Sequence, residues 1–206
     1  MDNKVSVAVL VSGGGTNLQA LLDAEKNGLM EHADIELVIS NVRDAYALTR
    51  AKQAGVKTAT VIKKELGSQE AFEQRIMDLL DAHDIDLIVL AGFMSILSKK
   101  FTSHYPDRII NVHPALIPSF CGKGFYGLKV HEAALAYGVK VTGATVHFVN
   151  EIPDGGKIIL QKAVDVLPDD TPETLQLRVM QEAEWKILPQ AVEMISAEIM
   201  KEALNK

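Results

Sequence analysis

Asn111 and His113 are the residues whose types and spacing are best suited to chemistry. They follow residues 108–110 (Arg-Ile-Ile) of an expected strand, and Pro114 stops the strand directly after them. Alternate residues of a strand project to the same side, so the amide and the imidazole should lie next to each other. An amide donor can stabilise an oxyanion while an imidazole moves protons near neutral pH, which suits acyl transfer. A histidine on a strand can equally be a hydrogen-bonded structural residue.

Asp154 is a candidate partner for this pair. It lies in the segment Pro153-Asp154-Gly155-Gly156, which separates two expected strands. A carboxylate that reached His113 would favour the imidazolium and raise the pKa of the histidine. Such a segment can also be an ordinary turn, and sequence spacing alone does not place Asp154 next to His113.

A glycine-rich loop at residues 12–17, Ser-Gly-Gly-Gly-Thr-Asn, joins the first expected strand to a helix. Glycines allow close approach of the backbone to an anion, and a helix N-terminus offers free N–H donors, so we expect a bound phosphate. A dinucleotide loop would need glycine at Leu18 and an acidic residue near Asn41, and a Walker loop would need Gly-Lys-Ser/Thr. Neither pattern is present. A tight turn that binds no ligand is the alternative.

The elements that must position these residues alternate along the first half of the chain. Apolar β-branched runs predict strands at residues 5–11, 36–40, 58–62 and 87–91. Apolar residues at three- and four-residue spacing predict helices at residues 18–24, 45–54 and 70–82. This alternation predicts an α/β fold with parallel strands and helices on both faces of the sheet, and ligands then bind at the carboxyl ends of the strands.

The second half has a different pattern. Residues 140–149 and 157–166 predict a hairpin-like pair, so the sheet should be mixed and mostly parallel. Residues 170–173, Asp-Thr-Pro-Glu, predict a helix start with a capping side chain before proline. We expect the following helix to be interrupted near Pro189 and to resume to about Leu204. A length of 206 residues fits a single domain over residues 1–206.

Composition narrows the class of protein. The net charge is −6 and the chain has no basic run, so we expect neither a nucleic-acid partner nor a membrane partner. The N-terminal residues do not have the pattern of a signal peptide, and the single cysteine, Cys121, excludes an internal disulfide. We therefore expect a cytoplasmic protein without a bound metal.

Four ordered segments together resemble the phosphoribosylglycinamide formyltransferases: residues 12–18 (SGGGTNL), 90–94 (LAGFM), 111–118 (NVHPALIP) and 154–156 (DGG). The resemblance runs from about residue 5 to residue 189. It implies a Rossmann-like formyltransferase fold and transfer of a formyl group from 10-formyltetrahydrofolate, as co-substrate, to the amine of 5-phosphoribosylglycinamide in purine biosynthesis. It also implies a nucleotide-substrate half at about residues 1–95 and a folate and catalytic half at about residues 96–206.

The resemblance assigns roles residue by residue. It implies a tetrahedral intermediate stabilised by Asn111 and a charged His113, with Asp154 raising the pKa of His113. The substrate phosphate would be bound by Gly15, Thr16 and Asn17, and the rest of that substrate by Glu184. The folate would be bound by Gln69, Met94, Ser95, Ile96, Leu97 and Asn111.

The chain also departs from the family pattern. Ser95 stands where many relatives carry arginine, and Gln69 stands where some do, so both weaken the local attraction for anions. The aromatic and glycine-rich residues 119–129 form a longer segment than in many members, which suggests either a mobile cover or a surface insertion. We expect His147 to be a core or supporting residue rather than a proton carrier. A monomer and a homodimer are both compatible with the family.

Other functions remain open from the sequence. A formyltetrahydrofolate deformylase would pass the formyl group to water, but it tends to have a second histidine where Pro114 stands and an additional N-terminal domain. A methionyl-tRNA formyltransferase would need a basic surface for RNA. A non-catalytic phosphate-binding protein would explain the glycine loop but not Asn111, His113 and Asp154.

Overall fold

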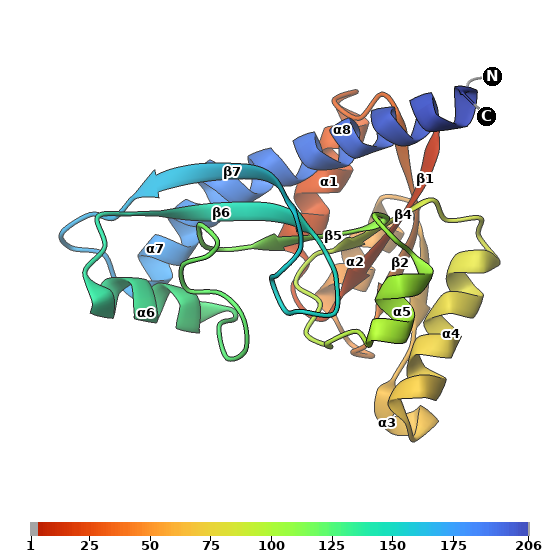
Figure 1. Cartoon of the computed structure of the whole chain (residues 1–206), viewed down its shortest axis with the longest axis horizontal. Helices are drawn as coiled ribbons and strands as arrows, with labels where there is room; N and C mark the ends of the chain where they lie inside the picture. Colours follow the sequence, from red (N-terminus) through yellow and green to blue (C-terminus); the bar gives the residue numbers. More distant parts are fainter. Residues whose placement is uncertain (1–3, 206) are drawn as a thin grey trace.

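The computed structural model describes residues 4–205. Seven strands form one sheet in the order β3-β2-β1-β4-β5-β6-β7, with helices packed on both faces (Figure 1). The strands are β1 (Val5–Val11), β2 (Ala33–Ser40), β3 (Lys57–Thr60), β4 (Leu87–Leu90), β5 (Ile109–His113), β6 (Val141–Phe148) and β7 (Ile158–Asp165). The helices are α1 (Thr16–Lys26), α2 (Tyr46–Gln53), α3 (Lys63–Leu66), α4 (Gln69–Asp81), α5 (Lys99–His104), α6 (Leu128–Tyr137), α7 (Pro172–Val179), the π-helix η1 (Met180–Glu184) and α8 (Trp185–Leu204).

The first five strands are parallel and the last two are antiparallel, which confirms the expected mixed, mostly parallel sheet. In β1 every side chain except that of Ser6 is buried, as expected for a strand covered on both faces. The strand β2 begins three residues earlier than predicted, because its first half alternates buried Ala33 and Ile35 with more exposed acidic residues. Buried and more exposed side chains thus alternate in the first half of β2, as in a strand with one buried face.

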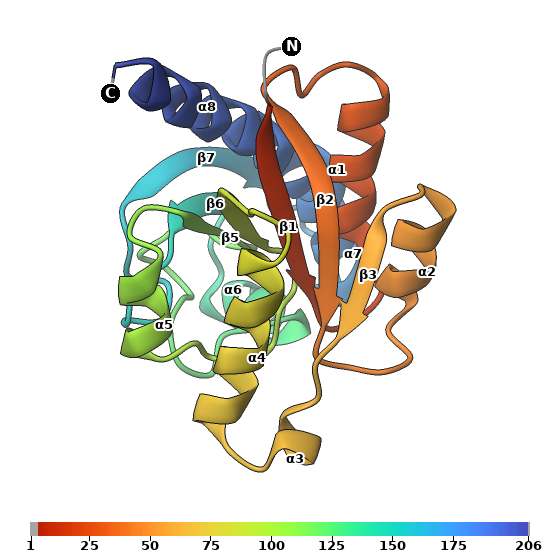
Figure 2. The same cartoon turned by 90° about the vertical axis from the view of Figure 1, so that its right-hand side faces the viewer.

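Two separate apolar cores lie on the two faces of the sheet. One contains residues of α1, α2, α7 and α8, and the other contains residues of α4 and α5. In Figure 2 the helices α1 and α2 lie on one side of β1 and β2, and α4 lies on the other. The prediction of helices on both faces is confirmed.

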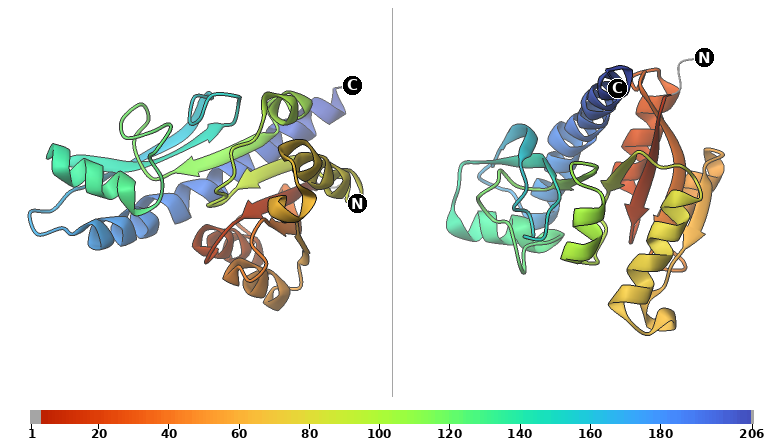
Figure 3. Two further views of the ribbon diagram at one scale, coloured as in Figure 1. Left: turned by 90° about the horizontal axis from the view of Figure 1, so that it is seen from below. Right: turned by 45° about the vertical axis from the view of Figure 1, so that its right-hand side comes forward.

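The long helix α8 crosses the sheet and contacts both its early strands β1 and β2 and its late strands β6 and β7 (Figure 3). The predicted interruption near Pro189 is wrong, because Pro189 lies inside α8. The irregular turn comes earlier, in η1, where the wider π-helical winding lets the backbone adjust before the proline. The predicted start of α7 is confirmed, with Thr171 as its N-cap and Pro172 in its first turn.

In the part of the chain that the structure describes, no helix combines the length and the apolar character needed to cross a membrane.

Candidate active site

The glycine loop ends at the N-terminus of α1, as predicted. Gly15 is the N-cap residue and has a left-handed backbone (φ 72°), which glycine adopts without strain. No side chain caps this helix end. In residues 4–205, no hydrogen bond to a protein acceptor is formed by the backbone N–H groups of Gly15, Thr16 and Asn17. Free N–H groups and the positive end of the helix dipole make this loop suitable for binding an anion.

Glu184 reaches this loop from the other end of the sequence. Its carboxylate accepts a hydrogen bond of 2.6 Å from the Asn17 side-chain amide, and only 6% of its surface is exposed. Burial raises the pKa of Glu184 to about 7, against the opposing effect of the bond from Asn17. The structure therefore brings Glu184 to the predicted phosphate site.

Asn111 and His113 lie at the carboxyl end of β5, on the same face of the strand as predicted. His113 is buried, with 4% of its surface exposed, and Asn111 is half-buried. The antiparallel register places Asn111 opposite His147 of β6, and the Asn111 side-chain nitrogen lies 3.2 Å from His147 Nε2. The neighbour of Asn111 is thus a second histidine.

Asp154 lies between these two histidines. Its two carboxylate oxygens are each 3.6 Å from a ring nitrogen, Oδ2 from His113 Nδ1 and Oδ1 from His147 Nε2. The backbone N–H of Gly122 also donates to Oδ2, at 2.7 Å. Burial raises the pKa of Asp154, but the two histidines and the Gly122 N–H together lower it by more than burial raises it. The net pKa is therefore below its ordinary value, and the carboxylate is charged at neutral pH.

Opposing effects act on the pKa of His113. Burial lowers the pKa of His113, while Asp154 and the carbonyl of Phe120 raise it; burial is the largest effect, and the net pKa lies below its ordinary value. Asp154 therefore acts in the expected direction but does not raise the pKa overall. A His113 that is charged during the reaction stays a prediction, because burial and the carboxylate of Asp154 act on its pKa in opposite directions.

The segment 119–127 covers His113. The carbonyl oxygen of Phe120 lies 2.8 Å from His113 Nε2, and Gly122 bonds Asp154 as described above. Phe120 has a left-handed backbone (φ 48°), and its ring contacts Phe125 and Tyr137 edge to face. This part of the predicted cover therefore lies over the site and contacts two of the three catalytic candidates, His113 and Asp154.

A small cavity of about 130 Å³ opens beside Asn111 and Asp154. Four of the six predicted folate residues line it, namely Ser95, Ile96, Leu97 and Asn111. Met94 and Gln69 do not line it. Met94 is 55% exposed, and the Gln69 amide instead donates to the Ile96 carbonyl at 3.1 Å and to Glu73 at 2.6 Å.

Two supporting contacts were not predicted, those of Glu73 and of Ser12. Glu73 is buried and accepts from both the backbone and the hydroxyl of Ser98, which fixes the loop that lines the cavity. Ser12 accepts from the backbone N–H of Met94 at 2.8 Å and so links this loop to the glycine loop. The alternation of His147 in its strand was visible, but its contacts with Asn111 and Asp154 depend on strand pairing, which the sequence does not reveal.

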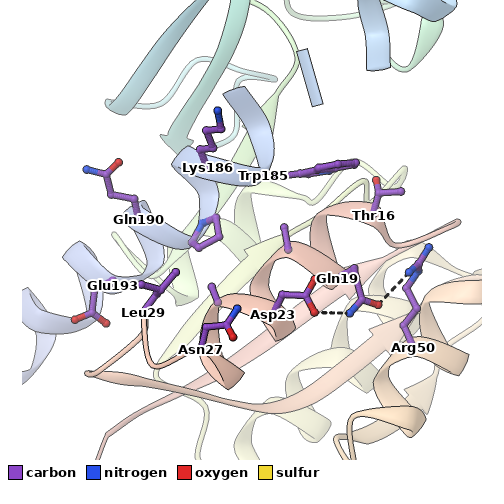
Figure 4. A pocket seen from close by; sticks show the side chains of 13 residues that line it. Thr16, Gln19, Asp23, Asn27, Leu29, Arg50, Trp185, Lys186, Gln190 and Glu193 are labelled. Carbon is purple, nitrogen blue, oxygen red and sulfur yellow. Dashed lines mark hydrogen bonds between the residues drawn. The ribbon is translucent and has the colours of Figure 1, made fainter. Parts of the chain in front are cut away.

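A larger cavity lies elsewhere, between α1 and α8 (Figure 4). It has a volume of about 700 Å³ and none of the three catalytic candidates lines it. Thr16 and Arg50 lie at one end, with Trp185 and Lys186 of α8 opposite α1. No cluster of three or more histidine, cysteine or acidic side chains suited to a metal ion occurs among the described residues.

Comparison with known proteins defines the class of this fold and site. Residues 5–192 match the family described as formyl transferases, and the chain belongs to that family. It is 43% identical to phosphoribosylglycinamide formyltransferase of Haemophilus influenzae over 89% of this chain and 83% of the relative. The family match and this relative put the chain among the phosphoribosylglycinamide formyltransferases, which are transferases.

Two further relatives agree. The crystal structure of glycinamide ribonucleotide transformylase 1 from Symbiobacterium toebii superimposes with a TM-score of 0.88, at 40% identity, over 95% of this chain and 89% of that one. The trifunctional purine biosynthetic protein adenosine-3 of Gallus gallus is 44% identical over 95% of this chain. The chain spans only 19% of the length of that trifunctional relative.

Proposed function

We propose that this chain transfers the formyl group of 10-formyltetrahydrofolate to the amine of 5-phosphoribosylglycinamide in purine biosynthesis. The observation that carries the proposal is the contact of Asp154 with both His113 and His147, beside Asn111 at the carboxyl end of β5. An oxyanion donor, a titratable ring and a charged carboxylate in one half-buried place are what acyl transfer to an amine requires. The names of the relatives supply the acceptor.

The acceptor's phosphate would bind at the free N–H groups of Gly15, Thr16 and Asn17. Glu184, bonded to Asn17, would accept hydrogen bonds from the remainder of the acceptor. This arrangement points the acceptor from α1 toward the end of β5, where its amine would meet the formyl group.

In the reaction the amine nitrogen forms a bond to the formyl carbon, and the formyl oxygen gains negative charge. The side-chain N–H of Asn111 would stabilise that charge. The bond between the formyl carbon and the folate nitrogen then breaks, and the proton lost by the amine ends on that nitrogen. His113 is the group placed to carry this proton, and Asp154 stabilises the ring while it is charged.

Burial of His113 indicates when in the reaction its ring would gain a proton. Desolvation lowers the pKa of the ring and so favours its neutral form before the reaction, and the ring would gain a proton as negative charge develops on the formyl oxygen next to it. Its Nε2 atom is already in contact with the Phe120 carbonyl at 2.8 Å. A substrate oxygen can use that nitrogen only if the Phe120 carbonyl moves away, so segment 119–127 must shift during turnover.

The donor would place part of its ring system in the cavity lined by residues 95–97. A volume of about 130 Å³ is below the usual range for a whole ligand of this size, roughly 300–1,000 Å³. The remainder of the donor would therefore lie along the exposed side chains of Met94 and Ile96, which are 55% and 69% exposed.

An absorbance assay for the deformylated folate tests the function. Purified protein should form product from 10-formyltetrahydrofolate only when 5-phosphoribosylglycinamide is present. Product formed without the amine would indicate a deformylase, and no product with any acceptor would indicate a binding protein. Either result would refute the proposal.

Single substitutions test the proposed roles of His113 and Asp154. His113→Ala and Asp154→Asn should each lower turnover by several powers of ten, because each removes an interaction that is strongest in the transition state. Asp107→Asn is the matched control, since Asp107 shares the left-handed backbone of Asp154 (φ 55° for both) but lies on the surface. Turnover of His113→Ala near that of the wild type would remove His113 from the mechanism.

A further inference from the structure

Helix α2 contacts the glycine loop at three successive residues. The backbone N–H of Ala47 donates to the Gly13 carbonyl at 3.1 Å, and Arg50 Nε donates to the Gly14 carbonyl at 2.8 Å. At Gly15 the fit is steric, because a β-carbon there would come within 2.6 Å of Ala47 Cβ. The conformation of the loop is thus fixed from α2 as well as from its own strand and helix.

These contacts determine the direction in which the loop's N–H groups point. In a trans peptide the carbonyl of one residue and the N–H of the next point to opposite sides of the chain. The bond from Arg50 to the Gly14 carbonyl therefore turns the Gly15 N–H away from α2. The bond from Ala47 to Gly13 does the same for the Gly14 N–H. The N–H groups of Gly14 and Gly15 therefore point away from α2, and we expect an anion to approach from that side.

Arg50 is itself held in place by its neighbours (Figure 4). Its Nη1 donates to Gln19 of α1 at 3.0 Å, and Gln19 in turn donates to Asp23 at 2.9 Å. The guanidinium carbon also lies 5.0 Å from the centre of the Tyr46 ring. A half-buried guanidinium with two directed bonds is not a freely moving surface cation.

We propose that Arg50 is a positioning residue for phosphate binding in this formyltransferase. Its planar group bonds the Gly14 carbonyl and Gln19 at once, so it joins α2, the glycine loop and α1 in the geometry that presents the Gly15 N–H to the phosphate. Lysine has the same charge but not the planar, forked set of N–H donors. It can therefore keep only one of the two hydrogen bonds, to the Gly14 carbonyl or to Gln19. The inference rests on the proposed function, because it assigns the residue to the phosphate of the acceptor.

Steady-state kinetics of Arg50→Met, Arg50→Lys and the control Lys52→Met test the role. Lys52 is an exposed cation on the same helix. Arg50→Met should raise the KM for 5-phosphoribosylglycinamide about tenfold, as expected for loss of a charged hydrogen bond. Its kcat and its KM for the folate should stay within twofold of the wild type. Arg50→Lys should lie between Arg50→Met and the wild type, and Lys52→Met should match the wild type.

The inhibition constant of inorganic phosphate against the acceptor should rise in parallel with that KM. The inference is overturned if Arg50→Met binds the acceptor and inorganic phosphate as the wild type does, or if Lys52→Met has the same effect, which would indicate charge alone. It is also overturned if kcat falls while KM is unchanged. If Arg50→Met does not fold, Gln19→Ala takes its place, with an expected rise in KM of about threefold and the same contrary outcomes.

Failure of the proposed function can be distinguished from failure of the inference about Arg50. A wild type without transferase activity refutes the function, and calorimetric titration with inorganic phosphate then still measures whether Arg50→Met weakens binding about tenfold.

Discussion

Three histidines lie near one another at the site, and they differ in what their ring nitrogens contact. His113 and His147 each contact Asp154, whereas neither ring nitrogen of His131 has a hydrogen-bond partner among the described residues. His131 is 1% exposed, on α6, and burial lowers its pKa to about 4, with a further effect of His113. A buried imidazole without partners is stable only in its neutral form.

His131 should therefore make the fold sensitive to acid. Because its pKa is lower in the folded state than the ordinary 6.5, the unfolded chain binds the additional proton, and stability is lost as pH falls from about 6.5 toward about 4. Replacement by leucine removes this effect. Between pH 7 and pH 5 the wild type should lose about 2 kcal/mol more free energy of unfolding than His131→Leu.

Urea denaturation at the two pH values measures the difference. His104→Leu, at an exposed position, is the control and should keep the pH dependence of the wild type. An equal loss in wild type and His131→Leu would show that His131 is not the titrating group.

At the scale of elements, the π-helix η1 is the feature that brings Glu184 to the glycine loop. It joins α7 to α8 and ends at Glu184, whose carboxylate is buried against Asn17. A π turn inserts additional backbone into a helix and rotates the residues that follow, and such turns are frequent at functional sites. Here it presents one carboxyl group to a loop from the opposite end of the chain.

Glu184 should destabilise the folded state at alkaline pH. Its pKa of about 7 lies above the ordinary 4.5, so the folded chain binds the additional proton and stability is lost as pH rises from about 4.5 to about 7. Glu184→Gln should therefore be more stable than the wild type by up to about 3 kcal/mol at pH 8, with the advantage almost gone at pH 4.5. It should also bind the acceptor less tightly.

Guanidinium denaturation at both pH values and a KM measurement check this. Glu182→Gln is the control from the same turn, since Glu182 is exposed. If Glu184→Gln gains the same stability at both pH values, ionisation of Glu184 is not the cause.

Much of the element pattern could be predicted from the sequence, because the periodicity of buried residues is local. The strand at Val5–Val11, the hairpin-like pair and the capped start at Thr171 were all predicted. The continuous path through Pro189 was not, because it depends on the π turn before it. Pairing of Asn111 with His147, 36 residues away, depends on the register of two strands. The low pKa of His113 depends on what covers it, and the sequence does not specify that either.

At the scale of the whole molecule, one continuous sheet carries both halves of the proposed site. The glycine loop follows β1, the catalytic candidates Asn111 and His113 lie at the end of β5, and α8 packs across early and late strands. The expected halves at residues 1–95 and 96–206 therefore share a sheet and a covering helix. We expect one cooperative unfolding unit.

Scanning calorimetry of the whole chain should show a single transition in which the calorimetric and van't Hoff enthalpies agree. A van't Hoff enthalpy well below the calorimetric one, or two resolved transitions, would mean that the halves unfold separately. The single domain expected from the length of the chain would then be incorrect.

The bond between Asn17 and Glu184 joins residues 167 positions apart. During synthesis the glycine loop and its helix leave the ribosome long before the carboxylate that closes the same site has been translated. The N–H groups of the proposed phosphate loop therefore face water until Glu184 has been translated. Contacts this distant in sequence also slow folding, since a very large loop has to close before they form. We therefore expect the candidate active site to be among the last parts of the described fold to assemble.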